Sequence, residues 1–145
     1  KSHPVDGEQM LVGEPTLATA AHIVRSHHER VDGGGYPDGL VGDEIPLAAR
    51  IIAACDAVDA MTHDRPYRKA MALPMAFAIL REHAGSQWDP VVVQQVIATV
   101  PSMGTVGALD TVGRHEDPTY ADATYDTIEM PHNVGAILAA VDAEI

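Results

Sequence analysis

The segment LAARIIAACDAVDAMT, residues 47–62, is the stretch of this 145-residue chain that most strongly predicts a helix. It holds no glycine or proline and is apolar nearly all round, which is typical of a helix buried on most of its surface. Asp56 and Asp59 lie three residues apart on it and therefore share a face. Either they face solvent or cap a neighbouring helix, or they are buried with partners, because an unpaired buried charge is costly. The apolar surroundings favour burial.

Further helices are predicted on both sides of this segment. Pro15 suits a first helical turn, Gly85 is a C-terminal cap, and Asp89 followed by Pro90 is typical of a cap and first turn. The predicted ranges are 5–12, 15–28, 73–84 and 90–100. Sustained two-residue alternation of apolar and polar residues is absent, so the predicted fold class is all-α.

His27 and His28 end the apolar stripe of the predicted helix 15–28 and are followed by Glu29. One interpretation is a metal site, because neutral imidazole is the commonest metal ligand and a nearby carboxylate usually orients it. The other is a pair of core or capping histidines that hydrogen-bond their neighbours, and the sequence leaves both open. Combined with Asp56 and Asp59, the metal interpretation indicates a hard divalent cation such as Mn²⁺ or Fe²⁺.

A glycine-rich loop is predicted at residues 30–46, between the histidine pair and the central helix. Its three consecutive glycines, ending at Gly35, allow the backbone to approach a ligand closely. The ring of Tyr36 offers a surface for stacking a base. Glycine content alone, however, favours a plain connection.

A short basic segment, DRPYRK at residues 64–69, interrupts an otherwise acidic chain and holds three of its nine Lys and Arg residues. One interpretation is a solvated turn with surface ion pairs. The other is an anion clamp, in which Arg65 and Arg68 grip phosphate oxygens with their planar guanidinium groups. A small positive patch on a negative protein favours small phosphate esters over long polyanions.

The net charge of −12 excludes a role in wrapping DNA, because such a surface repels nucleic acid. Residues 101–145 hold eight acids and one base and are predicted to be an irregular acidic tail with a short helix at 134–143. The single cysteine, Cys55, cannot form an internal disulfide, which predicts a reducing, cytoplasmic setting. No stretch approaches the ~20 apolar residues that span a bilayer.

Three segments together resemble the HD-GYP family of bacterial phosphodiesterases. They are HHERVDGGGYPDGLVGDEIPLAARIIAACDAVDAMTHDRPYRKA at 27–70, AGSQWDPVVVQQV at 84–96 and SHPVDGEQML at 2–11. The resemblance implies an HD-superfamily helical bundle over residues 1–100, followed by the tail at 101–145. It also implies a metal-dependent enzyme that hydrolyses cyclic di-GMP to linear pGpG or GMP, with two or three divalent ions, iron or manganese, as cofactors.

By position in the family's pattern, nine residues of this chain are implied to form the site. The implied metal ligands are His3, His27, His28 and Asp56. Asp56 and Asp59 are implied to be catalytic. Contacts to the cyclic dinucleotide are implied for Gly35, Tyr36, Asp59, Arg65 and Arg68.

The earlier half of the family's pattern, a further His and a His-Asp pair followed by Ile-Gly-Lys, has no match in this sequence before residue 3. The chain is therefore expected to be the C-terminal part of a longer protein, with a receiver or sensor domain upstream. The alternative is a non-catalytic, degenerate or truncated module that binds a partner such as a diguanylate cyclase. A third possibility is another HD-type phosphohydrolase acting on nucleotides, which the Gly-Tyr-Pro loop disfavours.

Overall fold

The computed structural model describes residues 2–64 and 69–103, and these residues form five α-helices and two short 3-10 helices without a β-strand. The elements in chain order are α1 (His3–Leu11), η1 (Pro15–Leu17), α2 (Ala18–Ser26), η2 (Gly42–Glu44), α3 (Leu47–Thr62), α4 (Leu73–Glu82) and α5 (Pro90–Met103). The predicted all-α class is confirmed. The predicted central helix 47–62 coincides with α3, whereas the predicted helix 15–28 is a 3-10 turn followed by a shorter α-helix.

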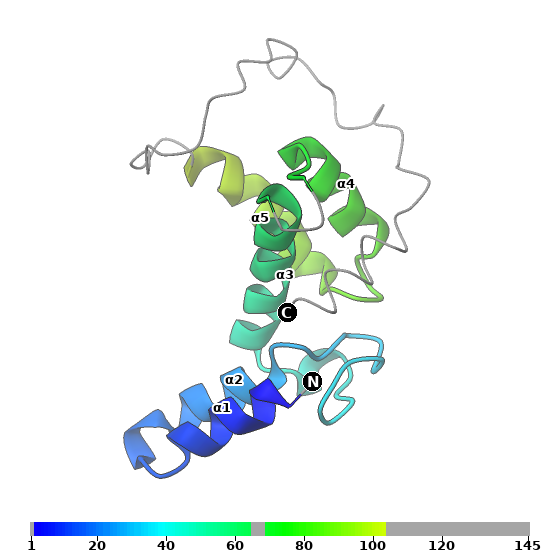
Figure 1. Ribbon diagram of the computed structural model, residues 1–145. Helices are drawn as coiled ribbons and strands as arrows, with labels where there is room; N and C mark the ends of the chain where they lie inside the picture. The colour runs from blue at the N-terminus through cyan, green and yellow to red at the C-terminus, as the bar shows by residue number, and fades with distance from the viewer. Residues whose placement is uncertain (1, 65–68, 104–145) are drawn as a thin grey trace.

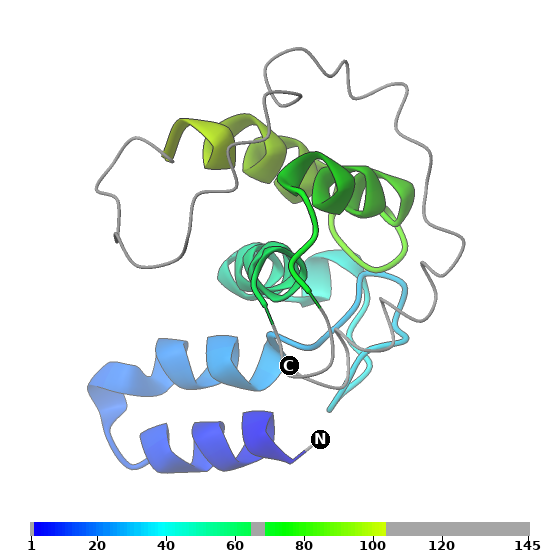
Figure 2. The same ribbon diagram turned by 45° about the horizontal axis from the view of Figure 1, so that its top comes forward.

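Helix α3 lies between two parts of the molecule (Figures 1 and 2). On one side α1 and α2 form an antiparallel hairpin, and on the other side α4 and α5 pack against α3. The loop that joins α2 to α3 folds back beside the end of the hairpin. Among the described residues, no helix is both long and apolar enough to cross a membrane.

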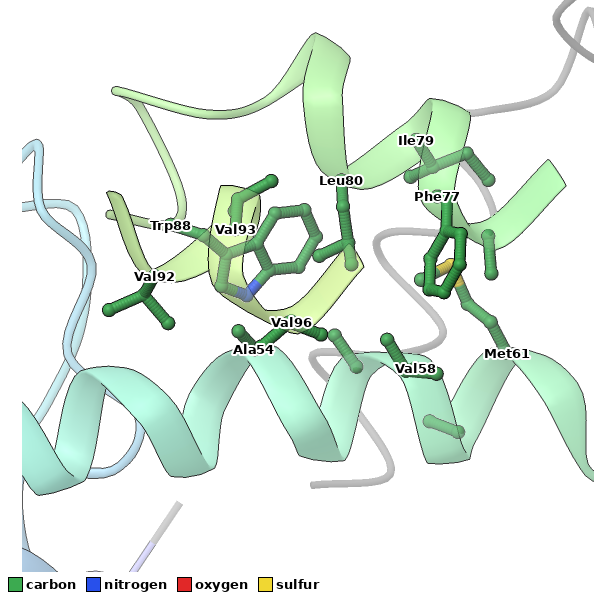
Figure 3. Packing of buried hydrophobic residues seen from close by; sticks show 13 residues of the cluster. Ala54, Val58, Met61, Phe77, Ile79, Leu80, Trp88, Val92, Val93 and Val96 are labelled. Carbon is green, nitrogen blue, oxygen red and sulfur yellow. The ribbon is translucent and has the colours of Figure 1, made fainter. Parts of the chain in front are cut away.

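The main hydrophobic core lies where α3, α4 and α5 meet (Figure 3). Val58 and Met61 of α3 face Phe77 and Leu80 of α4, and Trp88 closes one end of the cluster. The chain has one Phe and one Trp, and both are buried here. Burial of each large apolar side chain stabilises the fold by about 1.5–3 kcal/mol, so these contacts hold α3, α4 and α5 together as one unit.

Helix α5 begins where the sequence predicted, and the cap also fastens it to α3. The Asp89 carboxylate accepts the amides of Val91 and Val92 at 2.7 and 3.2 Å, which satisfies donors that a helix start leaves free. The same carboxylate pairs with Arg50 of α3 at 2.6 Å. One side chain therefore both starts α5 and sets its position on α3.

One face of α3 departs from the expected burial. Leu47, Ile51 and Cys55, each one turn apart, line an apolar groove of about 390 Å³ between α3 and α5. Leu47 is 57% exposed and Ile51 is 43% exposed. Alanines make up much of the buried face of α3, so close packing on α4 and α5 leaves the larger residues of this stripe at the surface.

The α1–α2 hairpin depends on a close approach of its two helices. A Cβ atom added to Gly7 of α1 would lie 2.7 Å from Cγ1 of Val24 on α2, which is closer than side-chain atoms pack. Arg25 of α2 pairs with Glu8 of α1 at 2.6 Å on the same hairpin. This close contact places the first residue of α1 beside the last turn of α2.

Candidate metal centre

Three imidazoles meet at the end of the hairpin. His3 is the first residue of α1, His27 is the C-cap of α2, and His28 follows it. Nε2 of His3 lies 2.9 Å from Nε2 of His28 and 3.4 Å from Nε2 of His27. One nitrogen from each ring lies within 4.8 Å of the others. The structure therefore brings together three of the four predicted metal ligands, from two separate segments of the chain.

The backbone fixes the protonation of one of these rings. Nδ1 of His27 lies 2.5 Å from the carbonyl oxygen of Val24, so Nδ1 must carry the proton that it donates. The lone pair of neutral His27 is then on Nε2, which is the atom that faces His3. A backbone carbonyl that orients an imidazole in this way is the usual support of a metal-binding histidine.

Two of the three ring-to-ring separations fit nitrogens bound to one shared cation. Nitrogens bound to a transition-metal ion at about 2.1 Å lie about 3.0–3.4 Å apart for bond angles near 90–110°. The observed Nε2 separations of 2.9 and 3.4 Å are close to this range. Although His3 is exposed, partial desolvation by its neighbours and the nearby His27 lower its pKa, which favours the neutral, metal-binding form at pH 7.

Asp56 reaches this region from α3. Burial raises the pKa of its carboxyl, an effect that the neighbouring His27 opposes and Asp59 adds to. Asp56 is therefore near His27, although it lies outside the group of three nitrogens that converge. A half-buried carboxylate beside imidazoles is costly until a cation compensates its charge.

The expectation that Asp59 is buried is wrong. Its side chain is 61% exposed, and its carboxylate lies 3.0 Å from Nδ1 of His63, one turn further along α3. An α-helix turns about 100° per residue, so two residues three apart lie about 60° apart around the helix axis. Asp56 and Asp59 therefore share a broad face of the helix without sharing an environment. Burial on α3 follows the contact with α4 and α5, which the apolar composition of the segment did not reveal.

Tyr36 lies directly on the imidazole cluster. Its ring stacks on that of His28, with centroids 4.9 Å apart and an angle of 19° between the planes. Its amide donates to the His28 carbonyl oxygen at 3.2 Å. The sequence predicted that this ring stacks on a base, and in the structure a histidine of the candidate metal site covers one face of it.

Gly35 is needed for packing of the loop itself. A Cβ atom added there would lie 2.3 Å from the Arg30 nitrogen and 2.5 Å from Cα of Glu29. The loop backbone therefore crosses directly over the backbone that follows the two histidines. This contact explains why the position is a glycine without requiring a ligand.

Glu29 does not have the position that the sequence suggested. It was expected to orient an imidazole, but its buried carboxylate accepts backbone amides of the loop, those of Asp38, Gly39 and Leu40, at 2.7, 3.1 and 3.1 Å. The error has a physical reason. A sequence shows that a carboxylate follows two imidazoles, but the path of the loop decides which donors it meets.

Sequence reasoning missed Arg25. Its guanidinium binds both carboxylate oxygens of Asp38 at 2.6 and 2.7 Å and also binds Glu8. The hydrogen bond from Arg25 lowers the pKa of Asp38. Arg25 thus connects α1, α2 and the loop. The sequence does contain an indication of this role, because Arg25 is a basic residue of an acidic chain and lies near the end of a predicted helix, one turn before His28.

Several predicted features lie outside the described residues. These are Arg65 and Arg68 of the proposed anion clamp, and the tail from residue 104 onward with its predicted helix at 134–143. Next to the first of these gaps, Lys69 pairs with Asp64 at 2.9 Å.

Comparison with known proteins places this geometry in context. The sequence profile of the HD domain family matches residues 1–92. Over 99 residues the chain is 43% identical to the cyclic di-GMP phosphodiesterase response regulator RpfG of Xanthomonas campestris pv. campestris (strain 8004), which covers 67% of this chain and 26% of that protein. Over 110 residues it is 39% identical to the cyclic di-GMP phosphodiesterase PA4108 of Pseudomonas aeruginosa, and this match covers 75% of this chain and 26% of that protein.

A further relative is named for a different substrate, 3′3′-cGAMP. The 3′3′-cGAMP-specific phosphodiesterase 3 of Vibrio cholerae is 42% identical over 90 residues, which is 62% of this chain and 20% of that protein. The chain thus spans about a quarter of the length of these curated relatives.

Proposed function

The chain belongs to the HD domain family, and from this premise we propose that it is the C-terminal part of a metal-dependent phosphodiesterase that hydrolyses cyclic di-GMP to linear pGpG or GMP. The HD-GYP type predicted from the sequence is confirmed by the family match and by the relatives. In this proposal residues 1–100 carry the catalytic domain, and residues 101–145 are an acidic extension.

The observation that carries the proposal is the convergence of the imidazoles of His3, His27 and His28. Their nitrogens lie within 4.8 Å of one another, and the Val24 carbonyl holds His27 in the tautomer that leaves Nε2 free to bind a cation. We assign Asp56 as the fourth ligand, because a cation would offset the cost of its half-buried charge.

A bound divalent ion would supply a water of lowered pKa and would polarise the phosphoryl oxygens. The residues of the chain perform the remaining tasks. His3, His27, His28 and Asp56 hold and orient the ion. Tyr36 and the loop backbone at Gly35 place a base and its phosphate beside the imidazoles. Asp59 is exposed enough to exchange a proton with solvent, and we assign it to proton transfer.

The ligand types also indicate the metal. Imidazole combined with carboxylate suits manganese and iron, and we propose two or three such ions in the complete site. Arg65 and Arg68 are proposed to grip the phosphates. A diguanylate cyclase or a receiver or sensor domain is the proposed protein partner. The cytoplasm is the proposed location, consistent with the single thiol of Cys55.

The test is a turnover assay on the full-length protein that contains this chain and, in parallel, a count of bound metal. The protein is incubated with Mn²⁺ and either cyclic di-GMP or 3′3′-cGAMP, and linear products are measured by mass spectrometry. His27→Ala is expected to abolish both metal binding and product formation. His22→Ala, an exposed histidine of α2, is the matched control and is expected to leave both unchanged.

A non-catalytic module is the second candidate function. It is favoured by one observation, that only three described side chains converge as candidate ligands. Wild-type protein that binds no Mn²⁺ but still binds a protein partner such as a diguanylate cyclase would support this alternative. Protein that binds Mn²⁺ fully and releases no linear product from either dinucleotide would refute the proposed hydrolysis.

A further inference from the structure

The buried carboxylate of Glu29 accepts three backbone amides of the loop. The residue is only 4% exposed. One oxygen accepts the amides of Asp38 and Gly39 and the other accepts the amide of Leu40. A buried carboxylate with three backbone donors is a strong, charge-assisted attachment, and loss of the acceptor would leave several amides unpaired.

These contacts attach the loop at residues 38–40. Earlier in the loop, the Asp32 amide donates to the Ser86 carbonyl at 3.0 Å, which attaches the loop to the segment between α4 and α5. Between the two attachments lies Tyr36, with its ring on His28 and its amide bonded to the carbonyl of the same residue. The position of Tyr36 over the imidazole cluster therefore depends on both attachments.

Glu29 is adjacent to His28 in the chain, and this connects the loop to the candidate metal site. The backbone from Glu29 to Arg30 is also where the loop makes a close approach, at Gly35. The attachment and two of the candidate metal ligands, His27 and His28, therefore belong to one short segment of the chain. The Glu29 carboxylate binds the loop amides, whereas Nδ1 of His27 has a separate backbone partner in the Val24 carbonyl.

We propose that Glu29 is a positioning residue that holds Tyr36 and the following loop at a fixed distance from the imidazole cluster, and that this sets the affinity for the cyclic dinucleotide without contributing to metal binding. The second part rests on the proposed function. The Arg25–Asp38 pair is a weaker candidate for the same task, because Arg25 is 28% exposed and Asp38 more so, and exposed ion pairs contribute little.

The experiment compares the wild-type 145-residue chain with Glu29→Gln and with Glu44→Gln. Glutamine keeps the shape of Glu29 but turns an amino group toward at least one loop amide. Glu44 is a matched control, because it is an exposed acid of the same loop that accepts the amide of Val41 at 2.9 Å. Three quantities are measured, namely amide hydrogen exchange at residues 36–40, the Mn²⁺ dissociation constant, and the cyclic di-GMP dissociation constant in saturating Mn²⁺.

In Glu29→Gln, exchange at the amides of Asp38, Gly39 and Leu40 is expected to be at least about tenfold faster, because a bond to a charged acceptor is lost at a buried site. Cyclic di-GMP is expected to bind about tenfold or more weakly. The Mn²⁺ constant is expected to stay within about twofold, and Glu44→Gln is expected to match wild type in all three measurements. In a turnover assay, KM should rise while kcat stays within about threefold.

Unchanged exchange at residues 38–40 in Glu29→Gln would overturn the proposal. So would a parallel loss of Mn²⁺ binding, because Glu29 would then support the metal site or the whole fold. A wild-type chain that does not bind cyclic di-GMP would overturn the proposed function and the affinity part of the inference. The exchange measurement would still decide whether Glu29 positions the loop.

Discussion

Replacement of Gly35 by alanine tests how tightly the loop is seated on the segment that carries the histidines. The new Cβ atom would lie 2.3 Å from the nitrogen of Arg30 and 2.7 Å from the carbonyl carbon of Glu29. These neighbours are backbone atoms, so no side-chain rotation relieves the clash. Ordinary contact begins at 3.4 Å, so the loop must retreat by about 1.1 Å from Arg30.

A retreat of this size has a calculable effect on stability. Overpacking at a close contact costs about 1–3 kcal/mol. For a domain of about 100 residues, each kcal/mol lowers Tm by about 4–8 °C, so a fall of about 4–24 °C is expected. Tyr36 follows Gly35 directly, and its stacking on His28 should weaken as the loop withdraws.

The assay is thermal unfolding followed by circular dichroism, with cyclic di-GMP titration as a second measurement. Gly34→Ala is the matched control. Its added Cβ atom would meet only side-chain atoms, of Asp32 and Arg30 at 3.1 and 3.2 Å, and these have room to move at an exposed position. Equal Tm values for Gly34→Ala and Gly35→Ala would refute the reasoning, because it requires the backbone contact at Gly35 to be the tighter one.

Three further predictions concern the site and its support. Substitution of His3 by alanine is expected to weaken Mn²⁺ binding at least about tenfold in calorimetry, because one of three converging ligands is lost, whereas His22→Ala should bind normally. Asp56→Asn is expected to weaken Mn²⁺ binding yet raise the Tm of the metal-free chain at pH 7. The reason is that burial raises the pKa of Asp56 in the folded state, so its ionised form opposes folding, and the gain should vanish below about pH 3.9, where folded and unfolded states are both protonated. Asp89→Ala should lower the free energy of unfolding by about 1–3 kcal/mol in urea titrations, through loss of the α5 cap and of the partner of Arg50. Burial raises the pKa of Asp89, but hydrogen bonds from the amides of α5 and from Arg50 outweigh this effect and lower the pKa overall. The contribution of Asp89 to stability is therefore present above about pH 3.9 and is lost as the pH falls through the lowered pKa of the folded state.

Much of the fold was predictable because its signals are local. The apolar run at 47–62 and the cap at Asp89 depend on residues within a few positions of each other, and both appear in the structure as predicted. The prediction of a metal site from His27 and His28 had the same basis, and the structure brings these two rings together with that of His3. His3 was identified only through the family resemblance, since nothing in its own neighbourhood indicates a ligand.

Local patterns in the sequence specify the helices, the acidic character and the residues able to bind a cation, because side-chain chemistry and helical spacing are contained within a few residues. Which of these groups come together is a property of the folded chain. The closeness of α1 to α2 brings His3 to His27, the path of the loop directs Glu29 to backbone amides, and packing of α3 on α4 and α5 leaves Asp59 exposed. These outcomes depend on contacts between distant segments, whose energies arise from packing and burial that no local pattern contains.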